Sequence, residues 1–261
     1  MTSPFENPAL WTSVATGYDT HARRITGDYS ARALELAKIA KGQRVLDVAC
    51  GPGTLVGMAL DRGAEVTAVD FAPGMVERCQ TNFPEANALV ADGQNLPFED
   101  EFDAAFSCFG LIFFPDRAAG FRSLLRSLVP GGAAVVTCWS PIDEDPLRTR
   151  LSEIFYAAFP SVERAAPPPD ALNSDSGLRT EMEAAGFANV EVVTHEAPVH
   201  FGHRELWDLM AESFPPITAM RSALPEVEWH AAAQRGRAWI AKHHDDAPLS
   251  AVGYLGLGRK G

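Results

Sequence analysis

The most constraining feature of this sequence is an alternation of two kinds of segment between residues 43 and 140. Short, β-branched apolar segments of strand length alternate with amphipathic segments whose apolar residues recur at helical spacing. Such an alternation forms a mostly parallel sheet that helices cover on both faces, so we expect an α/β fold. The expected strands are residues 44–49, 65–69, 87–91, 102–106 and 133–139, and the expected helices are residues 54–62, 73–82 and 116–128.

The segments on either side of residues 43–140 lack this regular alternation of strands and helices. Residues 1–42 are expected to form a helical cover, with the clearest helix at residues 29–40. Residues 140–173 include Pro167-Pro168-Pro169 and are expected to be an insertion or a loop-rich cover. We expect residues 1–261 to form a single domain. In it, residues 1–42 are the helical cover and residues 43–140 are a ligand-binding core. Residues 141–261 supply the insertion, the cover helices and the last strands. Beyond the insertion we expect helices at residues 174–185, 204–212 and 226–241, and strands at residues 189–196 and 251–257.

Charge and cysteine content narrow the class of protein. The chain has 22 Lys and Arg against 34 Asp and Glu, a formal charge of −12 that disfavours a nucleic-acid-binding face. It contains no run of roughly 18 apolar residues and no secretory signal, so we expect a cytoplasmic protein without a membrane partner. The four cysteines are widely spaced and form no C-x-x-C pair, so we expect reduced thiols and no metal.

The loop after the first expected strand, Asp47-Val48-Ala49-Cys50-Gly51-Pro52-Gly53-Thr54, carries the most chemical information. Glycine in such a turn lets a ligand approach the backbone where a side chain would collide. The helix that follows offers free N–H groups and a positive dipole end, which suit a carboxylate or phosphate. A tight strand-to-helix turn needs glycine for structural reasons too, so this loop alone does not identify a nucleotide site.

Two further aspartates strengthen that interpretation. Asp70 ends the second expected strand, where an acid binds both hydroxyls of a ribose. Asp92 ends the third, where an acid can accept from the exocyclic amine of adenine. Each aspartate alone fits a helix N-cap or a turn. With Asp47, three acids at successive strand ends indicate a nucleoside-binding site.

Five motifs resemble, in this order, those of the class I S-adenosylmethionine-dependent methyltransferases: D-x-A-C-G-P-G-T, V-D-F-A-P-G-M, A-D-G-Q-N-L-P-F, F-D-A-A-F and L-V-P-G-G. The chain most resembles the branch that includes the ubiquinone and menaquinone biosynthesis enzymes (methyltransferase type 11). The resemblance covers about residues 40 to 140. It implies a Rossmann-like, doubly wound sheet of seven strands, mostly parallel with an antiparallel last strand, and S-adenosylmethionine as the cofactor.

The resemblance also implies cofactor-binding roles for individual residues. It places Asp70 at the ribose hydroxyls, and Ser107 and Cys108 at the border between the sulfonium and the acceptor. Tyr18 resembles an N-terminal tyrosine that closes over the cofactor. The residues implied around the methionine part are Asp47, Ala49, Gly51 and Gly53. Those implied around the adenine are Phe71, Met75, Asp92, Gly93 and Gln94.

The acceptor is expected to be a small molecule. The segment after the fourth expected strand, Gly110-Leu111-Ile112-Phe113-Phe114, is apolar and lacks the motifs of nucleobase and protein arginine methyltransferases. Large apolar residues in the cover segments favour a hydrophobic or (hetero)aromatic acceptor, methylated at N, O or C by in-line displacement. Alignment and exclusion of water can supply much of the acceleration. If a base is used, His200 and His203 are the candidates, because they follow the sixth expected strand.

Two other functions stay open at this point. A catalytically silent protein that binds S-adenosylmethionine as a sensor or partner subunit would need the same cofactor residues. An NAD-dependent oxidoreductase also uses a glycine turn and an acid after the second strand. Its G-x-G-x-x-G fingerprint would require glycine where Val56 stands, and the chain contains no Y-x-x-x-K.

Overall fold

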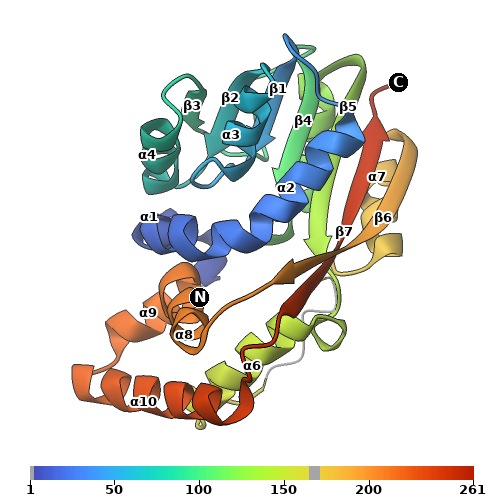
Figure 1. Ribbon diagram of the computed structural model, residues 1–261. Helices are drawn as coiled ribbons and strands as arrows, with labels where there is room; N and C mark the ends of the chain where they lie inside the picture. The colour runs from blue at the N-terminus through green and yellow to red at the C-terminus, as the bar shows by residue number, and fades with distance from the viewer. Residues whose placement is uncertain (1–2, 165–170) are drawn as a thin grey trace.

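A computed structural model describes residues 3–164 and 171–261 of this protein. Within this part of the chain, one seven-stranded sheet has the order β3-β2-β1-β4-β5-β7-β6 (Figure 1). The first five strands pair in parallel, and β7 lies antiparallel between β5 and β6. The strands are β1 (Arg44–Val48), β2 (Glu65–Asp70), β3 (Asn87–Val90), β4 (Phe102–Cys108), β5 (Leu128–Trp139), β6 (Ala188–Val199) and β7 (Leu249–Arg259).

Helices flank the sheet and extend beyond the carboxyl ends of its parallel strands (Figure 1). A π-helical turn, Tyr18–Ala22, joins the first two helices into one bent rod. The helices are α1 (Pro8–Gly17), α2 (Arg23–Ala37), α3 (Thr54–Asp61), α4 (Pro73–Asn82), α5 (Arg117–Ser127), α6 (Pro146–Ala158), α7 (Asp175–Ala184), α8 (His203–Ser213), α9 (Pro215–Ala223) and α10 (Glu226–His243).

Both faces of the sheet are buried. Neighbouring strand residues point to opposite sides, and the apolar side chains on each side pack against helices. On one face Val45 packs with apolar residues of α2, α3 and α4. On the other face its neighbour Leu46 packs with residues of α5 and α7. The same alternation continues at Ala105 and Phe106 of β4, which belong to the two different clusters. The strands therefore read as continuous apolar runs, as expected for a sheet between two helical layers.

Four helices, α6, α8, α9 and α10, form a separate layer that we call the helical lobe (Figure 1). The long strands β6 and β7 connect it to the sheet. Aromatic side chains form its interior, with Trp229 near both Trp207 and Phe159. Gly236 of α10 lets α8 approach closely, since a Cβ there would lie 2.2 Å from Trp207 Cζ3.

The expected fold class is confirmed, and the structure differs from the expected elements in several places. Residues 140–173, expected to be an insertion or a loop-rich cover, contain helix α6, which begins there because Asp145 caps it and Pro146 occupies its first turn. Helix α9 was not expected from the sequence. The prolines at positions 167–169 lie outside the described residues.

The fifth strand is longer than expected. It begins at Leu128 and runs through Pro130-Gly131-Gly132, which lie between the expected helix at residues 116–128 and the expected strand at residues 133–139. The backbone of Lys260 binds this segment on both sides, with Gly131 N donating to Lys260 O and Lys260 N donating to Gly132 O. Pairing with the segment after β7 therefore keeps these residues extended.

Within residues 3–164 and 171–261, no helix has both the length and the apolar content that crossing a bilayer requires. No group of three or more His, Cys, Asp and Glu side chains is arranged to hold a metal ion in the same residues.

Candidate functional site

A cavity of about 340 Å³ lies at the carboxyl ends of the parallel strands. Its lining includes Ala49 after β1, Phe71 after β2, Asp92 after β3 and Phe109 after β4. Ligands of open α/β sheets bind at this edge, and the volume falls within the range of about 300–1,000 Å³ of small-molecule sites. The topology thus assembles one site from loops that are distant in sequence.

The glycine loop after β1 forms the floor of this cavity. Gly51 has a φ of 55°, a left-handed conformation that glycine adopts without strain, and it lines the cavity. Gly53 also has a positive φ, 89°, but it faces α4. A Cβ at Gly53 would lie 2.8 Å from Cys79 Sγ, so this glycine allows close packing of the loop against α4. Gly53 therefore supports the loop from behind and does not line the cavity.

Asp70 is fixed by backbone N–H groups. Its Oδ2 accepts from Gly51 N at 3.0 Å, and its Oδ1 accepts from Ala72 N at 2.9 Å. Burial raises the pKa of this carboxyl to about 6, while the hydrogen bonds from the backbone of Ala72 and Gly51 oppose the rise. Asp70 is therefore a buried acid that is held in place and ionised above about pH 6.

Asp47 is buried, with 2% of its surface exposed, and its side chain lines the same cavity. Within the described chain, no group donates a hydrogen bond to its carboxylate. Burial and, secondly, the charge of Asp70 raise its pKa to about 8. A cationic group placed beside Asp47 would favour the ionised form, because an opposite charge lowers the pKa of an acid.

The loop after β3 forms another wall. Gln94 N donates to Asp92 Oδ1 at 2.9 Å, and Gln94 Oε1 accepts from Asp116 N at 2.8 Å. Between them, Gly93 admits the ring of Phe114, since a Cβ at Gly93 would lie 2.6 Å from Phe114 Cζ. All three residues of the Asp92-Gly93-Gln94 segment line the cavity. Asp92 is exposed, so this wall lies at the open end.

Aromatic residues from the N-terminal segment cover the cavity, and the sequence analysis did not assign them to the site. Phe5 stacks on Phe113 with ring centroids 4.5 Å apart, and Trp11 lies 5.4 Å from the same ring. Trp11 Nε1 donates to Phe5 O at 2.9 Å, which ties the two together. Helix signals at Asn7 and Pro8 mark the start of α1, but they contain no information on which loop it covers.

Tyr18 begins the π-helical turn and lines the cavity. A Cβ at Gly51 would lie 3.9 Å from Tyr18 Cε1, so the ring stands over the glycine loop. Burial, Asp70 and Cys108 all raise the pKa of the phenol, which therefore stays protonated at neutral pH. Turns of this kind occur often at functional sites.

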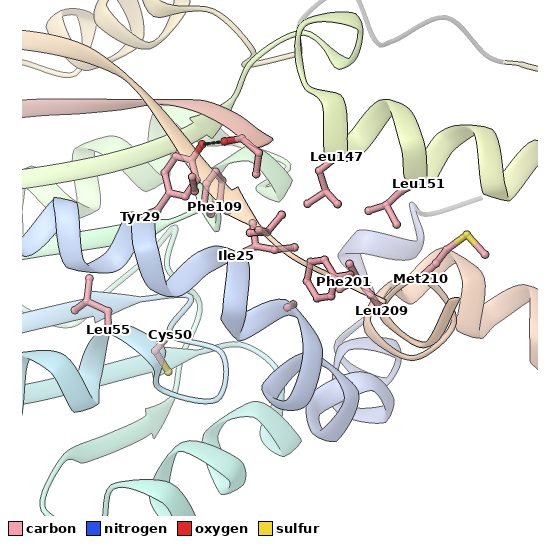
Figure 2. Close-up of a cluster of buried hydrophobic side chains, with 14 of the residues drawn as sticks. Ile25, Tyr29, Cys50, Leu55, Phe109, Leu147, Leu151, Phe201, Leu209 and Met210 are labelled. Atoms are coloured by element: carbon pink, nitrogen blue, oxygen red, sulfur yellow. Dashed lines mark hydrogen bonds between the residues drawn. The ribbon is translucent and has the colours of Figure 1, made fainter. Parts of the chain in front are cut away.

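The end of β4 contributes the opposite wall. Cys108 lines the cavity, and burial followed by the charge of Asp47 raises the pKa of its thiol. Phe109 has a φ of 60° and stacks on Trp139 at 3.7 Å. Figure 2 shows Phe109 beside Tyr29, whose ring it meets edge to face at 4.8 Å. A left-handed conformation is uncommon for phenylalanine, and here it accompanies packing of this ring between Tyr29 and Trp139.

Two other residues expected to bind the cofactor lie behind the cavity wall. Ser107 is fully buried, and its Oγ has no hydrogen-bond partner within the described chain. Met75 is buried in a small cluster with Val14 and Ala72, beneath α1. With Gly53, they are the members of the expected cofactor set that do not line the cavity. The other members do line it, as the topology of the strand ends predicts.

The two candidate bases lie elsewhere. His200 is exposed, and its carbonyl accepts from Arg24. His203 starts α8 in the helical lobe, where its Nε2 is 2.7 Å from His244 O. Neither residue lines the cavity. Their positions in the sequence suggested proximity to the acceptor, but the structure does not bring them to the site.

The chain is similar to known methyltransferases. Residues 45–132 match the family model of a methyltransferase domain. The demethylmenaquinone methyltransferase of Thermus thermophilus is 31% identical over 225 residues, covering 75% of this chain and 100% of that protein. The enzyme of the same name from Renibacterium salmoninarum is 32% identical over 164 residues, covering 61% of this chain and 69% of that protein.

The fold is also found among solved structures. One is the Haemonchus contortus phosphoethanolamine N-methyltransferase 2, in complex with phosphomonomethylethanolamine and S-adenosylhomocysteine. It superimposes with a TM-score of 0.53 and 16% sequence identity, over 89% of this chain and 52% of that chain. This likeness shows a shared fold.

Proposed function

Because the chain belongs to the class I S-adenosylmethionine-dependent methyltransferases, we propose that it methylates a small hydrophobic or aromatic molecule at N, O or C. The observation that carries this proposal is the composition of the cavity, where buried carboxylates lie beside aromatic side chains. The carboxylates suit the polar parts of the cofactor, and the aromatic walls suit an apolar acceptor.

The residues of the cavity fit S-adenosylmethionine. Its amino acid part carries an ammonium group, and Asp47 offers a buried carboxylate to which no group of the described chain donates. Its ribose carries two hydroxyls that can donate to Asp70, which the glycine loop holds in place. Its adenine carries an amine that can donate to Asp92. In this arrangement Phe71 packs against the adenine, and Met75 supports it from behind.

Bound S-adenosylmethionine supplies a methyl group on a positively charged sulfur. The work of the protein is then to align an acceptor with that group and to exclude water. Tyr18 and the stacked pair Phe5 and Phe113 cover the cavity against solvent. Cys108 and Phe109 form the wall at which an acceptor would approach. We assign no proton transfer to His200 or His203, because neither reaches this wall.

Two observations support an apolar acceptor. The cavity wall carries Phe109, Phe113 and Phe114, and apolar residues continue from there toward the helical lobe. Figure 2 shows members of this buried cluster, with Tyr29 beside Phe109 and Ile25 of α2 between Tyr29 and Phe201. In addition, the curated relatives are named as demethylmenaquinone methyltransferases.

A panel of acceptors tests the proposal. The purified protein is incubated with S-adenosylmethionine and each of several hydroquinones, phenols and heteroaromatic amines, and S-adenosylhomocysteine is quantified. Glycine and phosphoethanolamine serve as polar comparison acceptors. We expect turnover with at least one aromatic compound and none above background with the polar ones. Preferential methylation of glycine or phosphoethanolamine would show that the proposed acceptor class is wrong.

A further inference from the structure

One face of α4 contacts the N-terminal helices through three residues at helical spacing. Gly74, Arg78 and Asn82 are four residues apart and therefore lie along one side of the helix. At the first position, Gly74 N donates to Thr12 Oγ1 at 3.1 Å. A Cβ at Gly74 would lie 2.5 Å from Thr12 Cγ2, so glycine is required for this close packing. We call residues 8–22, which comprise α1 and the π-helical turn, the cap; Figure 1 shows α1 beside α4.

Asp19 occupies the other end of this contact. Its Oδ2 accepts from Arg78 Nε at 2.7 Å and from Asn82 Nδ2 at 3.1 Å. Only 9% of its side chain is exposed. Its Oδ1 is buried without a hydrogen bond in the described chain and lies 3.6 Å from Arg23 Nη1. Hydrogen bonds between charged groups are stronger than neutral ones, so Asp19 joins the cap firmly to α4.

Asn82 continues this connection to the cavity floor. The same Nδ2 that donates to Asp19 also donates to Pro52 O at 3.1 Å, within the glycine loop. Pro52 lines the cavity. On the cap side, Tyr18 precedes Asp19 in the π-helical turn and also lines the cavity. One side-chain amide therefore links the two sides of the cavity.

We propose that Asp19 is a positioning residue that couples the placement of Tyr18 to the conformation of the glycine loop through Asn82. The inference rests on the proposed function, since the molecule held between Tyr18 and the loop is S-adenosylmethionine. The coupling is reciprocal: a ligand that binds more tightly when the connection is intact also stabilises the connection. Arg78 keeps the Asp19 carboxylate oriented toward α4, while Asn82 transmits its position to Pro52.

A double-mutant cycle on ligand binding tests this coupling. Asp19→Asn, Asn82→Ala and the double variant are titrated with S-adenosylmethionine and with S-adenosylhomocysteine by calorimetry, and Tm is measured for each. We expect Kd to rise about tenfold in either single variant, within the usual range of coupling between sites. We expect the double variant to be no weaker than the weaker-binding single variant, because both substitutions break the same connection.

Asp208→Asn is the matched control. Asp208 is a partly buried acid on α8 that pairs with Arg204 and Arg237, away from α4. Its substitution should leave Kd within about twofold of the wild-type value. If Asp19→Asn does not fold, Asn82→Ala alone must show the rise in Kd.

Two results would overturn the proposal. One is a Tm that falls in Asp19→Asn while Kd stays within twofold of wild type, which would show a structural role only. The other is a double variant whose losses multiply, which would show independent contributions. Failure of the proposed function gives a different result, because the wild-type protein would then bind the cofactor but methylate no apolar acceptor.

Discussion

The cavity and the helical lobe use opposite parts of the backbone to hold their charged side chains. At the cavity, carboxylates accept from backbone N–H groups, as Asp70 does from Gly51 and Asp92 from Gln94. In the lobe, basic side chains donate to carbonyls at helix ends, as Arg235 does to Ala158 O at 2.7 Å. The acids therefore face the cavity, whereas the bases satisfy carbonyls that a helix leaves unpaired.

This difference explains where a ligand can bind. Asp70, which accepts one N–H bond at each carboxylate oxygen, still has acceptor capacity for the hydroxyls of a ribose. His203, by contrast, is engaged with His244 O, and His244 Nε2 is 2.8 Å from Phe201 O. The histidines of this corner therefore join the lobe to the end of β6. The cavity therefore holds acids that are free to bind a ligand, and the histidines of the lobe hold structural contacts.

The largest effect is expected from Asp70→Ala. The substitution removes the acceptor for the ribose hydroxyls and the partner of the Gly51 amide in the glycine loop. Hydrogen bonds to a charged group contribute about 1.5–3 kcal/mol each, so Kd for S-adenosylmethionine should rise at least about 100-fold. Titration calorimetry measures this Kd. The control is Glu77→Ala, a substitution of an exposed residue on α4. If Asp70→Ala binds S-adenosylmethionine as tightly as the wild-type protein, Asp70 does not bind the ribose hydroxyls. The contrast between the cavity and the helical lobe would then lose its main support.

Substitutions of Gly110 and Gly236 test whether packing in the helical lobe affects ligand binding in the cavity. A Cβ at Gly110 would lie 2.4 Å from Ala49 Cβ in the cavity wall, and a Cβ at Gly236 would lie 2.2 Å from Trp207 in the lobe. Overpacking of this kind costs about 1–3 kcal/mol, so both alanine variants should unfold at lower denaturant concentration. Only Gly110→Ala should also weaken S-adenosylmethionine binding. Equal losses of affinity in both variants would mean that the lobe shapes the cavity directly.

The smallest expected effect is a change in the protonation of Asp47 when the cofactor binds. The pKa of Asp47 is raised from 3.8 to about 8, so the folded chain keeps a proton that the unfolded chain has lost. Its contribution to the free energy of unfolding is therefore greatest at low pH and declines as the pH rises from about 4 to about 8. A ligand ammonium should favour the ionised form, so S-adenosylmethionine binding near pH 7 should release a proton.

Calorimetry in two buffers of different ionisation enthalpy measures this release. The isosteric variant Asp47→Asn should abolish it, while Asp92→Asn, whose side chain is exposed, should preserve it. Identical binding enthalpies in both buffers for the wild-type protein would argue against an ammonium group beside Asp47.

The sequence predicted those parts of the site in which the residue type and its place at the end of a strand both indicate ligand binding. Asp47, Asp70 and Asp92 end successive parallel strands, and the carboxyl ends of such strands meet at one edge. Their convergence on one cavity follows from the order of the elements. The roles of these residues toward the cofactor stay predictions, as does the division of residues 1–261 into cover, core and recognition segments.

The parts that could not be predicted depend on contacts between distant segments. Nothing near Phe5 or Trp11 in sequence indicates Phe113, which they meet only because α1 docks against α4. For His203, spacing after β6 suggested an acceptor site, but α10 returns and places the His244 carbonyl against it. Gly53 lies within a matching motif and Ser107 directly follows one, yet Gly53 faces α4 and Ser107 faces the core. Adjacent residues of a turn or strand point in different directions.

The antiparallel placement of β7 between β5 and β6 has a consequence for the order of assembly. A chain emerging from the ribosome presents β1 to β5 first, and these can pair as they appear. β6 cannot join them, because its neighbour in the sheet follows α8, α9 and α10 in sequence. The connection that contains α8, α9 and α10 therefore closes late, when residues 249–259 enter between β5 and β6. Until then β5 is the edge strand of the part of the sheet that contains Asp47 and Asp70.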